Sequence, residues 1–185
     1  HLHNIDVCNW AVGTHPEKVV ASGGAAWRPR DDVHGAIYDH LSAEFVYPNG
    51  VHMTSHCRQY PKGCATNVSE LIVGTKGRSN AHDLGSGTRQ DVRQGFKDPL
   101  ENPYVREHTA LLASIRGDGP YINHAMTVAD STMTCIMARE AAYSGLEITW
   151  DMIMKSQLDL MPKTFGYDQK MDFPSLPAPG QYKFI

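Results

Sequence analysis

The sequence predicts an α+β fold, in which strands that pair through a hairpin precede a set of longer helices. Two observations support this prediction. Apolar runs of strand length flank Pro48-Asn49-Gly50, and an Asn-Gly pair between two such runs is a strong hairpin pattern because both residues tolerate positive φ. Segments with helical spacing of apolar residues open the chain and fill most of residues 102–150. The 185 residues, 41% of them hydrophobic, suit one domain with its own core.

Composition and charge argue against nucleic acids and membranes as partners of the chain. The net charge is −3, from 17 basic and 20 acidic residues, and neither sign forms a block, which argues against a nucleic-acid-binding surface. No apolar run reaches membrane-spanning length and no signal peptide is visible. We therefore expect no nucleic acid or membrane partner and a cytoplasmic protein, or a periplasmic one if a signal precedes His1.

The cysteines and histidines follow no metal-binding pattern. None of the four cysteines forms a C-x-x-C pair, and the ten histidines include no H-E-x-x-H motif. We expect mostly reduced, buried cysteines and no metal site.

The first element expected is a helix that begins at the start of the chain. Apolar or small residues recur at helical spacing and a glycine follows where the helix would stop: Leu2, Ile5, Cys8, Val12 and then Gly13. No capping residue precedes this pattern, so we expect further residues upstream of His1 and a C-terminal piece of a longer protein.

His3 and Asp6 lie three residues apart on this helix and therefore share a face. A carboxylate beside a histidine orients the ring and stabilises its charged form, which suits a proton-transfer pair. The alternative is a histidine that is merely satisfied at a helix end.

Three strands are expected in the first third of the chain. A short strand over residues 19–21 should end in a glycine-rich turn at residues 22–24, and the hairpin should pair residues 38–47 with residues 51–59.

The hairpin loop sets which side chains share a face. If Asn49-Gly50 alone forms the loop, Tyr47 lies opposite His52 and Phe45 lies opposite Thr54. Neither face is then cleanly polar, and such a sheet is usually covered by helices on one side and by a partner or a second domain on the other.

The second half of the chain is expected to be mostly helical. The expected elements are a strand over 67–74, an exposed loop over 82–99, a helix from the Asn102 cap to Gly117, a long helix between Asn123 and Gly145, and a short helix capped by Thr149. One side of the long helix should hold Val128, Ala129, Thr132, Ile136 and Tyr143. A proline-rich tail over 161–185 should lie on the surface of its own or a neighbouring subunit.

No nucleotide-binding element is expected in the chain. Gly85-Ser86-Gly87 lacks the third glycine of a dinucleotide fingerprint, and no phosphate-binding P-loop motif occurs.

Several stretches together resemble the C-terminal substrate domain of bacterial-type Gfo/Idh/MocA family oxidoreductases. Their order and spacing carry the resemblance, which covers nearly the whole chain: residues 3–10, 13–16, 38–40, 47–51, 57–59, 74–77, 101–104, 141–145, 148–151 and 179–185. The resemblance implies an open, mostly antiparallel sheet with helices packed on one face and the other face available for subunit contact. It divides the chain into a substrate and oligomerisation domain over residues 1–160 and the tail over 161–185.

The resemblance also implies a function. The family transfers hydride between a sugar or polyol and NAD or NADP, which an N-terminal Rossmann domain absent from this chain would bind, so no cofactor is expected in this chain alone. His3 matches the family's catalytic histidine and Asp6 the acid one turn later. Arg58, Gln59 and Tyr60 fall at the strand end that lines the family's substrate pocket, although polar residues at a sheet edge are an equal alternative.

Two other functions stay open at this point. In the first alternative, the parent protein is a glycosidase or lyase that uses bound NAD in a transient oxidation. In the second alternative, the isolated chain is a non-catalytic binding and assembly module. The second alternative predicts an inactive homo-oligomer held by the sheet face, which a Phe45→Glu change should convert to monomers.

Overall fold

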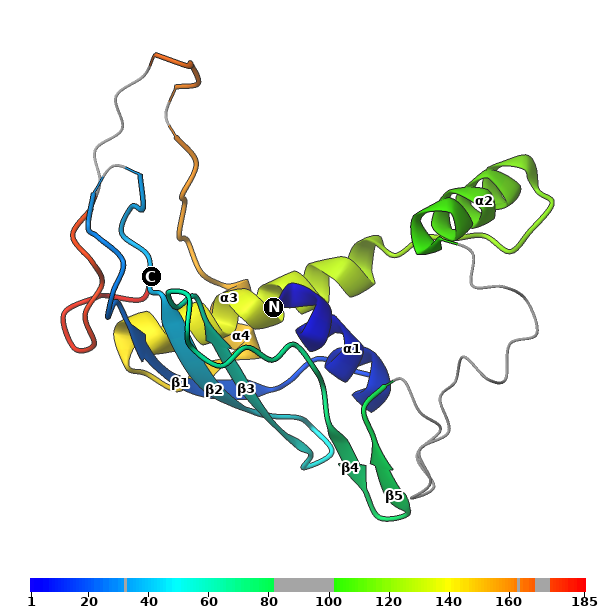
Figure 1. The fold of residues 1–185 in the computed structure, drawn as a ribbon, viewed down its shortest axis with the longest axis horizontal. Helices are drawn as coiled ribbons and strands as arrows, with labels where there is room; N and C mark the ends of the chain where they lie inside the picture. The colour runs from blue at the N-terminus through cyan, green and yellow to red at the C-terminus, as the bar shows by residue number, and fades with distance from the viewer. Residues whose placement is uncertain (32, 82–101, 163, 169–173) are drawn as a thin grey trace. The chain divides into compact units, whose positions relative to one another are not determined.

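The computed structural model describes residues 1–31, 33–81, 102–162, 164–168 and 174–185. The chain divides into two compact units. The first unit comprises His1–Thr66 and Asp130–Ile185, and the second unit comprises Asn67–Ala129. Figure 1 labels the helices and all strands except the short β6.

A four-stranded sheet forms the centre of the first unit. Its strands are β1 (Lys18–Gly24), β2 (His40–Val46), β3 (His52–Arg58) and β6 (Ile148–Thr149). They lie in the order β3-β2-β1-β6, and every neighbouring pair is antiparallel. The predicted α+β class with an open antiparallel sheet is confirmed.

β1 is longer than predicted because its glycines continue the strand. Gly23 pairs with Leu41 and Gly24 with His40 in the ladder to β2. A Cβ atom at Gly23 would lie 2.5 Å from the carbonyl oxygen of His40, so only glycine fits this close approach of two strands. The predicted turn at residues 22–24 is therefore wrong.

The hairpin between β2 and β3 is confirmed, but its predicted register is wrong by one residue. The Tyr47 amide donates to the Val51 carbonyl oxygen at 2.9 Å, which closes a three-residue loop. Gly50, the last loop residue, has a φ of 77°, the left-handed conformation that such loops require. As a result Phe45 faces Met53 rather than Thr54. A shift of one residue moves every side chain of β3 to the opposite face.

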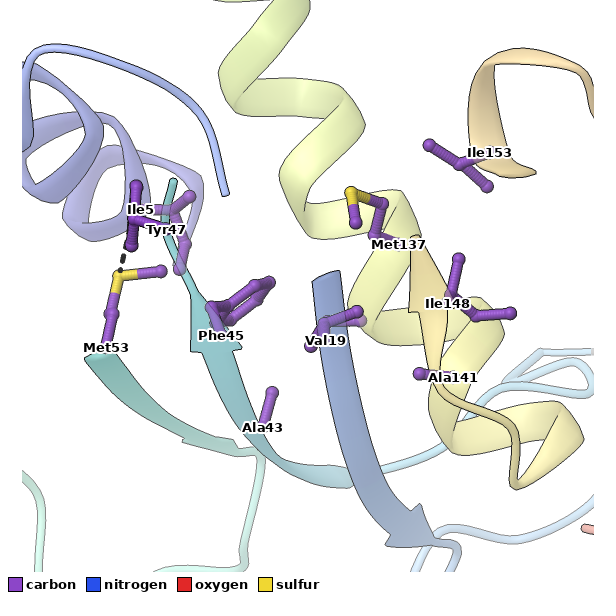
Figure 2. Close-up of a cluster of buried hydrophobic side chains, with 11 residues drawn as sticks. Ile5, Val19, Ala43, Phe45, Tyr47, Met53, Met137, Ala141, Ile148 and Ile153 are labelled. Atoms are coloured by element: carbon purple, nitrogen blue, oxygen red, sulfur yellow. Dashed lines mark hydrogen bonds between the residues drawn. The ribbon is translucent and has the colours of Figure 1, made fainter. Parts of the chain in front are cut away.

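The corrected register gives the sheet one apolar and one polar face. On the apolar face, Figure 2 shows Val19, Ala43, Phe45 and Met53 pointing toward the helices. The helices that cover it are α1 (Leu2–Val12), α3 (Ala125–Ser144) and α4 (Trp150–Met154), which contribute Ile5, Met137, Ala141 and Ile153. The opposite face carries His52, Thr54 and His56, all exposed.

Phe45 therefore belongs to the core and not to a subunit surface. Its side chain is 1% exposed. Replacing it by glutamate would unfold the domain, so that substitution is no test of oligomerisation.

The long helix α3 buries a different side from the one predicted. Within the first unit its buried residues include Ser131, Thr134, Met137, Ala138 and Ala141. Small side chains at three- and four-residue spacing let this helix pack closely, and an apolar period alone does not identify such a face. Gly145 ends the helix with a φ of 76°, as predicted.

The last part of the tail lies on its own chain. Tyr182 donates its hydroxyl proton to Glu140 Oε2 at 2.7 Å, and Tyr38 donates to the Pro177 carbonyl oxygen at 2.9 Å. Glu140 is 1% exposed and also pairs with Arg139 at 2.8 Å. Burial and the contact with Glu140 raise the pKa of Tyr182 to about 12.

The second unit contains a short hairpin and a helix. Strands β4 (Ile72–Gly74) and β5 (Gly77–Ser79) pair with each other, and α2 spans Pro103–Arg116. Asn102 caps α2 by accepting the Tyr104 amide, and Gly117 ends it, as predicted. The loop expected over residues 82–99 lies outside the described residues. In the described ranges, no helix has both the length and the apolar character needed to cross a membrane.

The hairpin register can be tested with two neighbouring substitutions. Met53→Lys places a charge in the core and should lower the free energy of unfolding by about 3 kcal/mol, whereas Thr54→Lys, on the exposed face, should change it by no more than about 0.5 kcal/mol. Urea denaturation of both variants measures the difference. If Thr54→Lys were the more destabilising substitution, the register with a two-residue loop would be the correct one.

Candidate functional site

A buried network of polar side chains fixes α1 in place. Tyr47 donates its hydroxyl proton to Asn9 Oδ1 at 2.6 Å. The Asn9 amide group in turn donates to Thr134 Oγ1 at 3.1 Å and to Ser131 Oγ at 3.4 Å. Ser131 donates to Asp6 Oδ1 at 2.6 Å. The network thus connects the end of β2 to α1 and α3.

The hydrogen bonds of this network run in one direction. Ser131 has a single hydroxyl proton, and that proton is committed to Asp6. Ser131 is 1% exposed and Asn9 is 7% exposed, so water does not compete strongly for these groups. The Asp6 carboxylate is therefore held by one oxygen, and its Oδ2 accepts no hydrogen bond from the described residues.

His3 lies one turn before Asp6 and is exposed to solvent. Within the described part of the chain, no hydrogen bond joins His3 to Asp6. The start of the helix is anchored instead by His1, whose Nε2 lies 2.7 Å from Ser55 Oγ on β3. The structure thus places both predicted catalytic residues on α1, with Asp6 hydrogen-bonded to Ser131 and His3 exposed to solvent.

Asp39 organises the opposite end of the β2–β3 hairpin. Its Oδ2 accepts the amide protons of Ala26, Trp27 and Arg28 at 2.7, 2.9 and 3.1 Å. Its Oδ1 accepts from His40 Nδ1 at 2.8 Å. Burial by itself raises the pKa of Asp39, but the hydrogen bonds from His40 and the three amides outweigh it and hold the pKa well below its usual range.

The loop that Asp39 holds meets Gln59, a predicted substrate-binding residue. Arg28 Nη2 donates to Gln59 Oε1 at 2.9 Å, and the Trp27 indole N–H donates to the Gln59 carbonyl oxygen. The backbone amide of Gln59 donates to the Asp39 carbonyl oxygen at 2.8 Å. Sequence reasoning assigned no role to Asp39, Trp27 or Arg28, because they lie up to 32 residues from Gln59.

Arg58 and Tyr60 form a second group at this strand end. The Arg58 guanidinium carbon lies 5.1 Å from the centre of the Tyr60 ring, a cation–π contact, and Arg58 Nη2 donates to the Ala65 carbonyl oxygen at 2.8 Å. The His40 ring meets the Tyr60 ring edge-on at 6.1 Å. Arg58 thus contacts Tyr60, whereas Gln59 contacts Arg28. The structure places the three predicted residues at the end of β3, in two separate sets of contacts.

The described residues do not fit a metal ion or a dinucleotide. They contain no cluster of three or more histidine, cysteine, aspartate or glutamate side chains that would hold a metal. The Rossmann type of dinucleotide site needs parallel strands, a glycine-rich loop and a helix, whereas every strand pair in the described ranges is antiparallel. The four cysteines are free, and burial raises the pKa of Cys135 to about 11.

Comparison with solved structures shows where this fold occurs. The chain is similar to the aldose-aldose oxidoreductase of Caulobacter crescentus in complex with glycerol, with a TM-score of 0.55 and 15% identity over 80% of this chain and 45% of that chain. It is also similar to the WlbA dehydrogenase of Bordetella pertussis in complex with NADH and UDP-GlcNAcA. The TM-score is 0.56 and the identity 18%, over 80% of this chain and 42% of that chain.

A third similar structure is the scyllo-inositol dehydrogenase of Lactobacillus casei with NAD(H) and scyllo-inositol, at a TM-score of 0.50 and 15% identity over 80% of this chain and 46% of that one. The chain spans less than half the length of each structure. No protein-family model matches the sequence, and no curated protein is significantly similar to it. At these identities the similarity establishes the fold of the chain.

The polar network can be tested by removing its last donor. Ser131→Ala leaves Asp6 without its hydrogen bond and should lower the free energy of unfolding by about 1–3 kcal/mol. Thr127→Ala, on an exposed position of the same helix, is the control and should change it by no more than about 0.5 kcal/mol. Urea denaturation measures both, and equal values would show that the Ser131 contact contributes nothing.

Asp39 should make the stability of the protein sensitive to acid. Its pKa in the folded state lies below the 3.8 of the free side chain, so its contribution to stability is complete above about pH 4 and is lost as the pH falls below 3.8. Asp39→Asn should lower stability at pH 7 and reduce the loss of stability below pH 4. Denaturant unfolding at a series of pH values measures both effects. If the stability of the variant falls below pH 4 as steeply as that of the wild type, Asp39 is not the cause of the acid sensitivity.

Proposed function

We propose that this chain is the substrate domain of an NAD(P)-dependent oxidoreductase of the Gfo/Idh/MocA type that acts on a sugar or polyol. The observation that carries the proposal is the arrangement on α1, where Ser131 holds Asp6 at 2.6 Å one turn from an exposed His3. Residues 1–160 form the substrate and oligomerisation domain in this proposal, and residues 161–185 form a tail that packs on it.

His3 is the proposed base. Oxidation of an alcohol carbon requires that the hydroxyl proton be removed as hydride leaves, and a histidine ring is suited to accept that proton near neutral pH. Asp6 is the proposed orienting group. Its Oδ1 is occupied by Ser131, so its Oδ2 is available to accept a hydrogen bond from a substrate hydroxyl or from the His3 ring.

Arg58, Gln59 and Tyr60 are the proposed substrate-binding residues. A polyhydroxylated ligand needs several hydrogen-bonding groups, and amide and guanidinium groups supply them in fixed geometry. Asp39 and Trp27 hold the backbone of Gln59, and Arg28 holds its side-chain oxygen. A side chain with fixed neighbours can orient a sugar with little loss of conformational entropy.

The similar structures support the proposal by analogy of fold. They are oxidoreductases whose complexes contain NADH or NAD(H) and a sugar derivative or polyol. The chain corresponds to less than half of each, so the nicotinamide would be bound by another part of the full-length protein. A homo-oligomer formed through the sheet face is part of the proposal, and the polar side chains of that face, such as Glu44 and His52, would then lie in the contact.

The test is an assay of the full-length protein that contains this chain. Reduction of nicotinamide is followed by absorbance with a panel of sugars and polyols. His3→Ala should lower kcat by about 100-fold or more while leaving the melting temperature unchanged, because the side chain is exposed.

His124→Ala is the matched control, since His124 is also exposed but lies in the second unit, directly before α3, and the activity of this variant should equal that of the wild type. Equal activities of the two variants would remove His3 from the mechanism. Turnover without net nicotinamide reduction would favour a glycosidase or lyase with bound NAD. Absence of both turnover and nicotinamide binding would favour an assembly module.

A further inference from the structure

The strand end around Gln59 carries cationic side chains that have no acidic partner among the described residues. Arg28 and Arg58 donate only to neutral groups, the Gln59 amide oxygen and the Ala65 carbonyl oxygen. Arg30 follows in the same loop as Arg28. In the described ranges, the only arginine within 4.0 Å of a carboxylate oxygen is Arg139. The strand end thus holds positive charge that the described part of the chain does not neutralise.

The side chain of Arg28 also contains a hydrogen-bond donor without a partner among the described residues. Its Nε is a buried donor without a hydrogen-bond partner, while its Nη2 is held by Gln59 Oε1. A buried donor left unpaired destabilises the folded state, so native structures rarely keep one without a reason such as the binding of a ligand.

Asp39, which accepts the backbone amide of Arg28, does not serve as the counter-charge of its guanidinium group. The Asp39 side chain is 0% exposed, and both of its oxygens are occupied, by three backbone amides and by His40. It accepts the backbone amide of Arg28 and makes no contact with the guanidinium group within 4.0 Å. Asp39 therefore fixes the backbone that presents Arg28 and leaves its charge free.

We propose that Arg28, together with Gln59 and Trp27, forms a subsite for an anionic group, so that the substrate is a sugar that carries a carboxylate or a phosphate. This inference rests on the proposed function and names its substrate class. A guanidinium group binds a planar carboxylate or a phosphate through two parallel N–H donors, and such charge-assisted bonds are about twice as strong as neutral ones. Gln59 accepts from Arg28 and keeps the guanidinium oriented, and the half-exposed indole of Trp27 borders the position.

The experiment measures equilibrium binding, which needs no turnover. Calorimetric titration of the full-length protein is carried out with D-glucuronate, D-glucose 6-phosphate and neutral D-glucose. One or both anions should bind about 10-fold or more tightly than glucose, and the better anion identifies carboxylate or phosphate as the group recognised.

Two substitutions separate charge from geometry. Arg28→Gln should remove the preference for the anion, and Arg28→Lys should keep only part of it because lysine lacks the forked donors. Arg116→Gln, in α2, is the control and should bind like the wild type. Melting temperatures verify that each variant is folded, and a folded Arg28→Gln variant that keeps the preference overturns the inference.

The outcomes distinguish this inference from the proposed function. Equal binding of glucose and both anions overturns the anion subsite, even if His3-dependent nicotinamide reduction is found. Tight, Arg28-dependent binding of an anion without any nicotinamide reduction supports the subsite and contradicts the oxidoreductase. Binding by His3→Ala equal to that of the wild type shows that recognition at Arg28 is separate from proton transfer.

Discussion

The register of the β2–β3 hairpin is the constraint on which the rest of the first unit depends. Gly50 adopts a φ of 77°, which closes a three-residue loop and sets Phe45 opposite Met53. The same register points Ser55 toward α1, where it meets His1. A hairpin shifted by one residue would turn His52 and Thr54 into the core and leave the start of α1 without its anchor.

A polar network then determines where α1 lies on the sheet. Tyr47, at the end of β2, is 1% exposed and donates to Asn9. Asn9 and Ser131 carry the connection to α3 and Asp6. Because buried polar groups are costly when unpaired, this set of donors and acceptors is satisfied in one arrangement of the helices and fixes it more narrowly than apolar contacts would.

The other end of the hairpin is organised by a single carboxylate. Asp39 gathers three backbone amides of the preceding loop and a histidine, and this brings Trp27 and Arg28 to Gln59. The first unit therefore holds two chemically different groups. One comprises Asp6 and the exposed His3 on α1, and the other comprises Arg28 and Gln59 at the end of β3.

Local patterns in the sequence determined which elements form. The helix ends at Gly13, Gly117 and Gly145 and the existence of the hairpin follow from residues within a few positions, since left-handed glycines and caps act locally. Helical spacing in the sequence predicts His3 and Asp6 as a proton-transfer pair, and the resemblance predicts them together with Arg58, Gln59 and Tyr60 as site residues. The hairpin face followed from the three-residue loop, which the Asn-Gly pattern did not distinguish from a two-residue loop. Tertiary contacts decided the buried side of α3 and the hydrogen bond between Arg28 and Gln59. They join residues that lie far apart in the sequence, such as Ser131 and Asp6 at a separation of 125 residues, whose pairing no local pattern encodes.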